Sequence, residues 1–377
     1  MGRRGPIDGE RVSLWIECAH RCLAKAGEDE CADVVRTFQT ERQFCVVLVS
    51  GTQGGEQARE RADTMAARLA QGDPLADVAA GALAALSSRA HVPFSILQVL
   101  DGTQVYVIEC DAPPLFLVHE SYLLLLPVLE EERHGRLVRQ SQFELHDGDH
   151  LAMVSEGYLY PRRWGWRGIA HAVRRWTDTN CDAGELLDAL VSTYRRLNKQ
   201  ALDRDVTVVA MHARPIRSAT LWTGPPVDGE QDEKVLHAVM AEEGRRVICG
   251  GTTASIAARL LEAELAVEPR PADGWAEVPP VSQLEGIDLV TEGLVTLRKA
   301  QERMIGVERA RDLTAGEDGA TRLARTLLAS DKIHVIVGLA VNPQQVDDSG
   351  VPLRRSIVED LIADLRARGK LVTVETC

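Results

Sequence analysis

The sequence lacks the features that mark membrane, nucleic-acid-binding and secreted proteins. No apolar run reaches the length of a membrane span, and the longest, at 122–129, is interrupted by Pro127. Acidic residues outnumber basic ones by 56 to 43, and the net charge of −13 argues against nucleic acid as a partner. The first ten residues contain arginines without an apolar segment behind them, unlike a secretory signal. We therefore expect a cytoplasmic protein that binds neither nucleic acid nor membrane.

The eight cysteines also lack the spacing of common metal or redox motifs. None stands in a C-x-x-C pair, and several lie within apolar runs. This usage indicates free thiols in a reducing compartment. Cys18, His20, Cys22 and Cys31 are close enough in sequence to suggest a zinc ion, but their spacing matches no standard zinc site.

What the chain does contain is an ordinary globular composition, with 45% hydrophobic and 26% charged residues. Its 377 residues exceed what one core usually supports, so we expect two domains. The composition changes near residue 215, where residues 213–234 are rich in proline, glycine and charge. We interpret this segment as a linker or extended connection and predict domains at 1–215 and 216–377.

The first half contains many short strands and four amphipathic helices. Candidate strands are 11–23, 44–51, 94–100, 103–110, 114–118, 122–129, 137–145, 149–154 and 206–213. Candidate helices are 56–71, one beginning at Pro74, 167–176 and 183–200. Hairpin strands around paired helices predict an α+β fold with two sheets and helices packed outside them.

The second half instead alternates apolar strands with amphipathic helices. Strand patterns at 245–251, 286–293 and 332–341 are each followed by a helical pattern. This alternation predicts a smaller α/β domain with a mostly parallel sheet.

Five segments of the first half occur in an order known from one enzyme family. They are "GEDECADVV" (27–35), "VLVSGTQGGEQA" (47–58), "APPLFLV" (112–118), "HDGDHLAMVSEGYLYP" (146–161) and "RDVTVVAM" (204–211). In these segments the sequence resembles the PPM-type, metal-dependent protein serine/threonine phosphatases, most closely their stage II sporulation protein E branch. "VICGGTTASIAARLL" (247–261) and "GIDLVTEGLVTL" (286–297) resemble a C-terminal extension of some members.

The resemblance implies an α–β–β–α sandwich whose carboxylates hold two Mg²⁺ or Mn²⁺ ions. In such a centre the ions acidify a bridging water and neutralise the phosphate group under attack. Hard cations of this kind require oxygen ligands, preferably anionic ones. The implied activity is hydrolysis of a phosphoserine or phosphothreonine.

Two of the expected metal ligands are retained at the N-terminal end of this pattern and one is lost. Asp33 matches the aspartate of the first motif, and Gly51 matches a glycine whose carbonyl would serve as a ligand. Ser50 stands where the family has the aspartate that bridges the two metals.

The later motifs depart further. Glu156 replaces an aspartate, which keeps the charge but adds a methylene. The last motif of the family reads D-D-x-T, and this chain keeps its second aspartate as Asp205 and its threonine as Thr207. Arg204 replaces the first aspartate of that motif, and a guanidinium offers only donors and repels cations. We predict a degenerate metal site in which Arg204 stands in for the metal charge, beside Asp33 and Glu156.

These departures favour a regulatory pseudophosphatase in bacterial signalling that acts by binding a protein partner or phosphoprotein, with Mg²⁺ or Mn²⁺ bound weakly or not at all. Two alternatives remain open. Asp33, Glu156 and Asp205 could hold at least one metal and keep phosphatase activity. Otherwise the activity could lie in the C-terminal domain.

The C-terminal alternative depends on a strand–glycine–helix junction. Gly250 and Gly251 follow an apolar strand, and Thr252 or Thr253 opens a helix whose N–H groups could hold a small anion. Glu292 ends the next strand and is expected near the same edge of the sheet. The equally simple alternative is a capped helix after a tight turn.

A final segment, 161–176, carries five arginines and three tryptophans without an acidic residue. In an acidic protein such a patch could dock a phosphorylated or acidic partner. Alternatively it is a solvated helix face whose tryptophans are anchored in the core.

Overall fold

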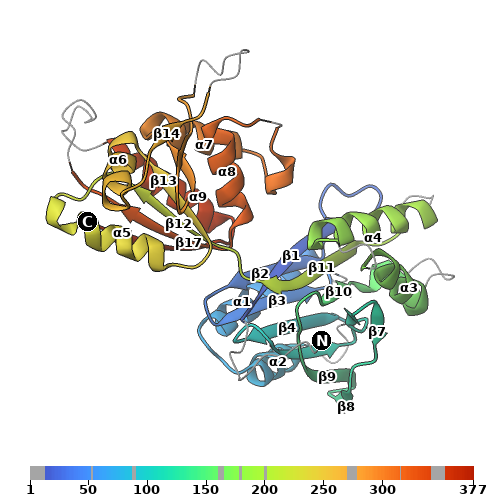
Figure 1. The fold of residues 1–377 in the computed structure, drawn as a ribbon. Coiled ribbons are helices and arrows are strands. Elements are labelled where there is room, and N and C mark those ends of the chain that lie inside the picture. The colour runs from blue at the N-terminus through green and yellow to red at the C-terminus, as the bar shows by residue number, and fades with distance from the viewer. Residues whose placement is uncertain are drawn as a thin grey trace, which may run out of the picture. The chain divides into compact units, whose positions relative to one another are not determined.

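The chain forms two compact units, residues 1–215 and 216–377, each with its own sheets and helices (Figure 1). The structure is a computed structural model, and it describes residues 13–51, 54–86, 91–159, 165–177, 181–198, 202–269, 278–314, 316–340 and 353–377. Among the described helices, none combines the length and the apolarity needed to cross a membrane.

The N-terminal unit contains a five-stranded sheet in the order β1-β11-β10-β6-β7. All neighbours in it are antiparallel, and β1 pairs with β11 along its whole length. The strands are β1 (Leu14–Leu23), β6 (Phe116–His119), β7 (Tyr122–Leu124), β10 (His150–Val154) and β11 (Val206–Pro215).

The second sheet of this unit has six strands in the order β2-β3-β4-β5-β9-β8, again all antiparallel. The strands are β2 (Val34–Gln39), β3 (Gln43–Val49), β4 (Phe94–Leu100), β5 (Gln104–Cys110), β8 (Val128–Arg133) and β9 (Arg136–Glu144).

Helices cover the outer face of each sheet. The six-stranded sheet is covered by α1 (Gly55–Ala70) and α2 (Leu75–Ala84), and the five-stranded sheet by α3 (Gly165–Thr177) and α4 (Ala183–Leu197). In α1 the buried side chains recur at helical spacing, as Ala58, Ala62, Met65 and Leu69. A capping box between Asp182 and Glu185 fixes the start of α4.

Three apolar layers follow from this arrangement. One lies between the sheets and contains Val46, Leu97, Met153 and Val209, while the other two lie under the helix pairs. The predicted α–β–β–α sandwich is thus confirmed. Its short 3₁₀ helix η1 (Glu156–Leu159) directly follows β10.

The C-terminal unit has one seven-stranded sheet in the order β14-β15-β16-β13-β12-β17-β18. Its last five members are parallel, which confirms the predicted mostly parallel sheet. The strands are β12 (Ser218–Thr223), β13 (Arg245–Cys249), β14 (Ala266–Val267), β15 (Ser282–Leu284), β16 (Ile287–Thr291), β17 (Lys332–Val337) and β18 (Leu371–Thr376).

Helices cover both faces of this sheet. Helices α5 (Asp232–Ala241) and α6 (Gly251–Leu260) bury their apolar side chains on one face. Helices α7 (Leu294–Met304), α8 (Gly319–Ala329) and α9 (Leu353–Ala367) bury theirs on the other. Two 3₁₀ helices, η2 (Gly229–Gln231) and η3 (Ala310–Asp312), complete the unit.

Some sequence interpretations were wrong. Residues 218–223 are not a linker but β12, a buried strand in the interior of the C-terminal sheet, because the apolar core of "SATLWT" outweighs its proline- and glycine-rich flanks. The run at 122–129 is not one strand, since Pro127 separates β7 from β8 and the two belong to different sheets. Strand β2 was missed because its exposed face is polar.

Candidate functional site

The residues of the phosphatase-like pattern meet at one end of the sandwich. Asp33 precedes β2 and Ser50 follows β3, and these strands pair so that Val34 lies opposite Val49. Glu156 follows β10 and Asp205 precedes β11, so these two come from the other sheet. The site is therefore assembled from strand ends of both sheets.

Asp33 is the most deeply placed of these acids, with 5% of its surface exposed. Its Oδ1 accepts a hydrogen bond from the Gly51 N–H at 3.0 Å, and its Oδ2 accepts one from the Thr207 hydroxyl at 3.1 Å. The second bond joins the two sheets. Both oxygens of the retained aspartate are thus engaged in holding the fold together.

The backbone around Asp33 is closely packed. A Cβ added to Gly51 would lie 2.1 Å from the Ala32 carbonyl oxygen, so only glycine fits there. Ser50 is buried, and its N–H donates to the Pro93 carbonyl at 2.8 Å. Packing against Ala32 therefore explains by itself why position 51 is a glycine, independently of any role of its carbonyl as a metal ligand.

On the other sheet, Thr207 and Ser155 exchange two hydrogen bonds. The Ser155 N–H donates to the Thr207 carbonyl, and the Thr207 N–H donates to the Ser155 hydroxyl, each at 2.9 Å. A Cβ at Gly157 would lie 2.0 Å from the Asp205 carbonyl oxygen. This network fixes the backbone beside Glu156 and Asp205.

The remaining two acids also have partners. Asp205 Oδ1 accepts from the Lys25 N–H at 2.9 Å. Glu156 Oε2 lies 3.3 Å from His91 Nε2, a contact that the sequence pattern did not reveal because His91 belongs to none of the five segments. His91 also lies 3.8 Å from Asp111.

Arg204 is exposed and precedes Asp205 in the bend before β11. Within the described residues, the polar contacts of Asp33 and Glu156 go to Gly51, Thr207 and His91. The pairing of Arg204 with these acids remains a prediction.

The donor set does not fit a two-metal centre. Ser50 offers a hydroxyl in place of the bridging carboxylate, and Arg204 offers only donors in place of another. Among the described residues, the group of three with ligand atoms close enough to hold a metal ion does not include Asp33, Glu156 or Asp205. Magnesium and manganese prefer several anionic oxygens around one point.

Two cysteines adjoin this end of the sandwich. Cys22 lies opposite Thr207 in the β1–β11 pair, and Cys31 precedes Asp33 by two residues. A hydrogen bond with the Cys31 thiol lowers the pKa of Cys22 to about 7, against the effect of burial. The same bond, together with burial, raises the pKa of Cys31. Cys22 is therefore the more reactive thiol of the pair.

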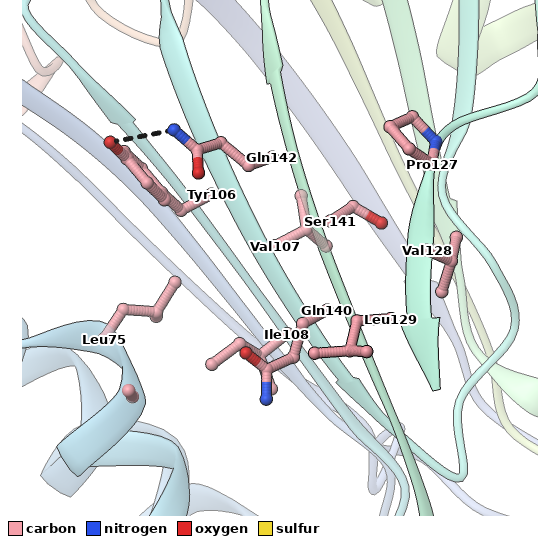
Figure 2. A pocket seen from close by; sticks show the side chains of 11 residues that line it. Leu75, Tyr106, Val107, Ile108, Pro127, Val128, Leu129, Gln140, Ser141 and Gln142 are labelled. Carbon is pink, nitrogen blue, oxygen red and sulfur yellow. Dashed lines mark hydrogen bonds between the residues drawn. The ribbon is translucent and has the colours of Figure 1, made fainter. Parts of the chain in front are cut away.

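A separate pocket of about 520 Å³ lies between α2 and the strands β5, β8 and β9 (Figure 2). Gln142 Nε2 donates to the Tyr106 hydroxyl at 3.3 Å on one side of it. Val128 and Leu129 line the other side and are largely exposed. None of the predicted site residues lines this pocket.

In the C-terminal unit the structure brings the predicted ligand-binding residues together. The Gly250 N–H donates to the Thr291 carbonyl at 2.8 Å, which places the start of α6 beside the end of β16. Both carboxylate oxygens of Glu292 lie 3.2 Å from the position of a Cβ on Gly251. Thr252 is exposed, and Thr253 is fully buried.

The basic and aromatic segment forms α3 from residue 165 onward, while residues 161–164 lie outside the described part. Ile169 and Val173 are buried, whereas Trp166 and Trp176 are 50% and 36% exposed. The Arg167 guanidinium lies 5.4 Å from the centre of the Trp166 ring. These two tryptophans are not anchored in the core, contrary to the simpler of the two interpretations.

Comparison with known proteins gave solved structures only: no family model and no curated protein matches the chain. One similar structure contains the PP2C phosphatase domain and a fragment of the regulatory domain of the cell-fate determinant SpoIIE from Bacillus subtilis. It is 17% identical, with a TM-score of 0.44, over 54% of this chain and 64%, just under two thirds, of that chain.

Two further structures match the chain in a similar way. The RsbU and RsbW domains of a Mycobacterium tuberculosis protein match at 14% identity and a TM-score of 0.44, over 60% of this chain and 69% of that one. The catalytic domain of the serine/threonine protein phosphatase PstP, with two manganese ions, matches at 15% identity and a TM-score of 0.39, over 54% and 100%. The α–β–β–α sandwich predicted from the resemblance agrees with the observed layers.

Proposed function

We propose that the N-terminal unit is a PPM-type phosphatase-like domain without two-metal hydrolysis, which acts as a regulatory binding protein in bacterial signalling in the cytoplasm. The observation that carries this proposal is the loss of carboxylates around Asp33. The register of β2 and β3 places Ser50 opposite Asp33, where the bridging carboxylate is expected, and Arg204 replaces another aspartate. A centre built on these groups lacks the anionic oxygens that would neutralise a phosphate under attack.

The α3 face supports a binding role. It presents Trp166, Arg167, Arg174, Arg175 and Trp176 at the surface of an otherwise acidic protein. Exposed tryptophans and arginines are the residues that most often anchor protein interfaces, and arginine pairs well with carboxylate and phosphate groups. An acidic or phosphorylated protein segment fits this face.

The decisive experiment compares the native chain with the Ser50→Asp, Arg204→Asp double variant. We expect the native chain to leave a phosphoserine peptide intact in Mn²⁺ and to bind Mn²⁺ weakly at this end. The double variant restores two carboxylates and should bind Mn²⁺ in calorimetric titration. Hydrolysis by the native chain at an ordinary enzymatic rate would establish the alternative, an active phosphatase that uses Asp33, Glu156 and Asp205.

Two controls assign the result to the site. Adding Asp33→Asn to the double variant should abolish the restored Mn²⁺ binding. Arg42→Asp, which makes the same charge change as Arg204→Asp on a side chain that is 86% exposed, should not create it. Restored binding that survives Asp33→Asn would place the ion elsewhere.

A second candidate function belongs to the C-terminal unit, and Thr253 is the observation that favours it. Its hydroxyl is buried at the start of α6 and has no hydrogen-bond partner within the described residues. The Glu292 carboxylate beside Gly251 disfavours the small anion expected from the sequence. A small hydroxyl- or amine-bearing ligand fits this edge better.

This candidate is tested by thermal shift on the full chain with simple polyols and with phosphate. We expect a polyol to raise the melting temperature of the native chain but not of Glu292→Gln or Thr253→Val. Ser255→Ala, on the same helix, is the matched control and should respond like the native chain. Stabilisation by phosphate that strengthens in Glu292→Gln would show an anion site instead.

A further inference from the structure

A second group of polar side chains lies at the opposite end of the five-stranded sheet. Asp149 directly precedes β10, and His119 is the last residue of β6. These strands are antiparallel with His150 opposite Val118, so the next pair outward is Asp149 and His119. His119 Nδ1 lies 2.6 Å from Asp149 Oδ1.

A tight turn adds a third member to this group. The His146 N–H donates to Asp149 Oδ2 at 2.8 Å, and the Asp149 N–H donates back to the His146 carbonyl at 3.1 Å. Gly148 closes the turn with a φ of 87°, which glycine adopts without strain. His146 Nδ1 then lies 3.8 Å from Asp149 Oδ2, and the two imidazole centres are 4.9 Å apart.

The three side chains differ in solvent exposure, from the buried Asp149 to the exposed His146. The carboxylate of Asp149 is 1% exposed, whereas the side chains of His119 and His146 are 30% and 61% exposed. One ligand atom from each lies within 4.8 Å of the others. Tetrahedral zinc with bonds of about 2.0–2.1 Å separates its ligand atoms by roughly 3.4 Å. Zinc binding would therefore draw His146 inward and open the His119–Asp149 contact, now 2.6 Å, to about that distance.

One histidine would already satisfy the buried carboxylate. The second imidazole faces the same carboxylate at 3.8 Å, which is too far for a hydrogen bond. A divalent cation between the two imidazoles and the carboxylate would be bound by all three. Imidazole nitrogen suits zinc, whereas magnesium prefers oxygen ligands alone.

We propose that His119, His146 and Asp149 bind one Zn²⁺ ion, with water in the fourth position on the solvent side. The site is distinct from the Asp33 end of the sandwich. Asp149 and Ser155 flank β10 and are six residue steps of about 3.3 Å apart, so roughly 20 Å separate the two ends. Strand β11 spans the same distance in reverse, with Thr207 at one end and Ala213, bonded to Asp149, at the other.

The test is calorimetric titration of Zn²⁺ into the chelator-treated full chain at neutral pH. We expect one Zn²⁺ per chain and no comparable binding of Mg²⁺. His146→Ala, a surface substitution that leaves the Asp149 turn bonded through its backbone, should weaken zinc binding by at least about tenfold. His119→Ala should do the same. Native affinity in both variants would overturn the proposal.

Two controls exclude other zinc ligands. His237→Ala removes a histidine that is 79% exposed and 3.9 Å from Glu233, without a second imidazole, and should bind zinc like the native chain. The Cys22→Ser, Cys31→Ser double variant should also bind normally. Cobalt(II) should give d–d absorption without sulfur-to-metal charge transfer. Loss of zinc binding in the cysteine variant alone would assign the ion to the thiols and overturn the proposal.

Discussion

The two ends of the sandwich use buried aspartates in different ways. At one end Asp33 bonds two donors of the protein, a backbone N–H and a threonine hydroxyl from the facing sheet. At the other end Asp149 bonds its own turn and an imidazole that is partly open to solvent. The carboxylate that the family pattern marks as a metal ligand thus contacts donors of the protein, while an aspartate outside the expected ligand set lies beside two imidazole rings.

The strongest test of this contrast is Asp33→Ala. It leaves the Gly51 N–H and the Thr207 hydroxyl buried without their acceptor, so we expect a loss of about 3 kcal/mol in the free energy of unfolding. Urea unfolding measures it. Asp29→Ala, at an exposed position of the same loop, should stay within about 0.5 kcal/mol of the native chain. A loss below 1 kcal/mol at Asp33 would mean that its two bonds contribute little.

Glycine substitutions compare the two ends directly. Gly51→Ala places a methyl group against the Ala32 backbone, and we expect it to cost about 2–3 kcal/mol. Gly148→Ala meets no atom within 4 Å but keeps a positive φ, so it should cost about 1 kcal/mol. Equal losses in thermal unfolding would contradict the packing difference between the ends.

The Cys22–Cys31 pair makes the Asp33 end sensitive to pH. With a pKa of about 7, Cys22 becomes thiolate as the pH rises through neutrality, so its alkylation rate should rise there. Cys18, on the same strand, has a pKa raised by burial to about 12 and should react at least about tenfold more slowly. Iodoacetamide labelling followed by mass spectrometry measures both rates. In Cys31→Ala the midpoint for Cys22 should move upward, and an unchanged midpoint would contradict the hydrogen bond.

The smallest expected effect concerns Glu17 near the Asp149 end. Burial raises its pKa, but the His212 imidazole, 3.8 Å away, and the Arg214 guanidinium, which donates a hydrogen bond to it, outweigh burial and hold the pKa below its ordinary value. Ionised Glu17 therefore stabilises the fold above about pH 4.5, and this stabilisation disappears as the pH falls through its folded pKa. Glu17→Gln should lose at most about 1 kcal/mol at pH 7, with the difference from the native chain shrinking toward pH 3. The exposed Glu28→Gln is the control.

Much of the architecture could be predicted because it follows from local hydrophobic periodicity. The strand and helix periodicities of 44–51 and 56–71 became β3 and α1 with small shifts at their ends. Strand β12 could not be recognised locally, because its role depends on β13 and β17, which lie far along the chain. Because proline and glycine flank this six-residue strand, local composition predicts a linker there.

The same distinction applies to the sites. The five segments located Asp33, Ser50, Glu156 and Asp205 at one end of the sandwich, since each follows or precedes a strand. They did not reveal that the Thr207 hydroxyl bonds Asp33, because that contact depends on how the two sheets pack. His119 and His146 lie in different segments of the sequence, and only the β6–β10 register brings His119 to Asp149.

The pairing of β1 with β11 has a consequence for synthesis on the ribosome. Strand β1 is synthesised before every other strand of its sheet, yet it lies at the edge of that sheet with β11 as its neighbour, and β11 begins at Val206. A nascent chain that has not reached that residue must hold an apolar strand without its partner. The N-terminal unit therefore cannot fold progressively from its first strand, and translational pauses before residue 206 should expose it to chaperones or aggregation.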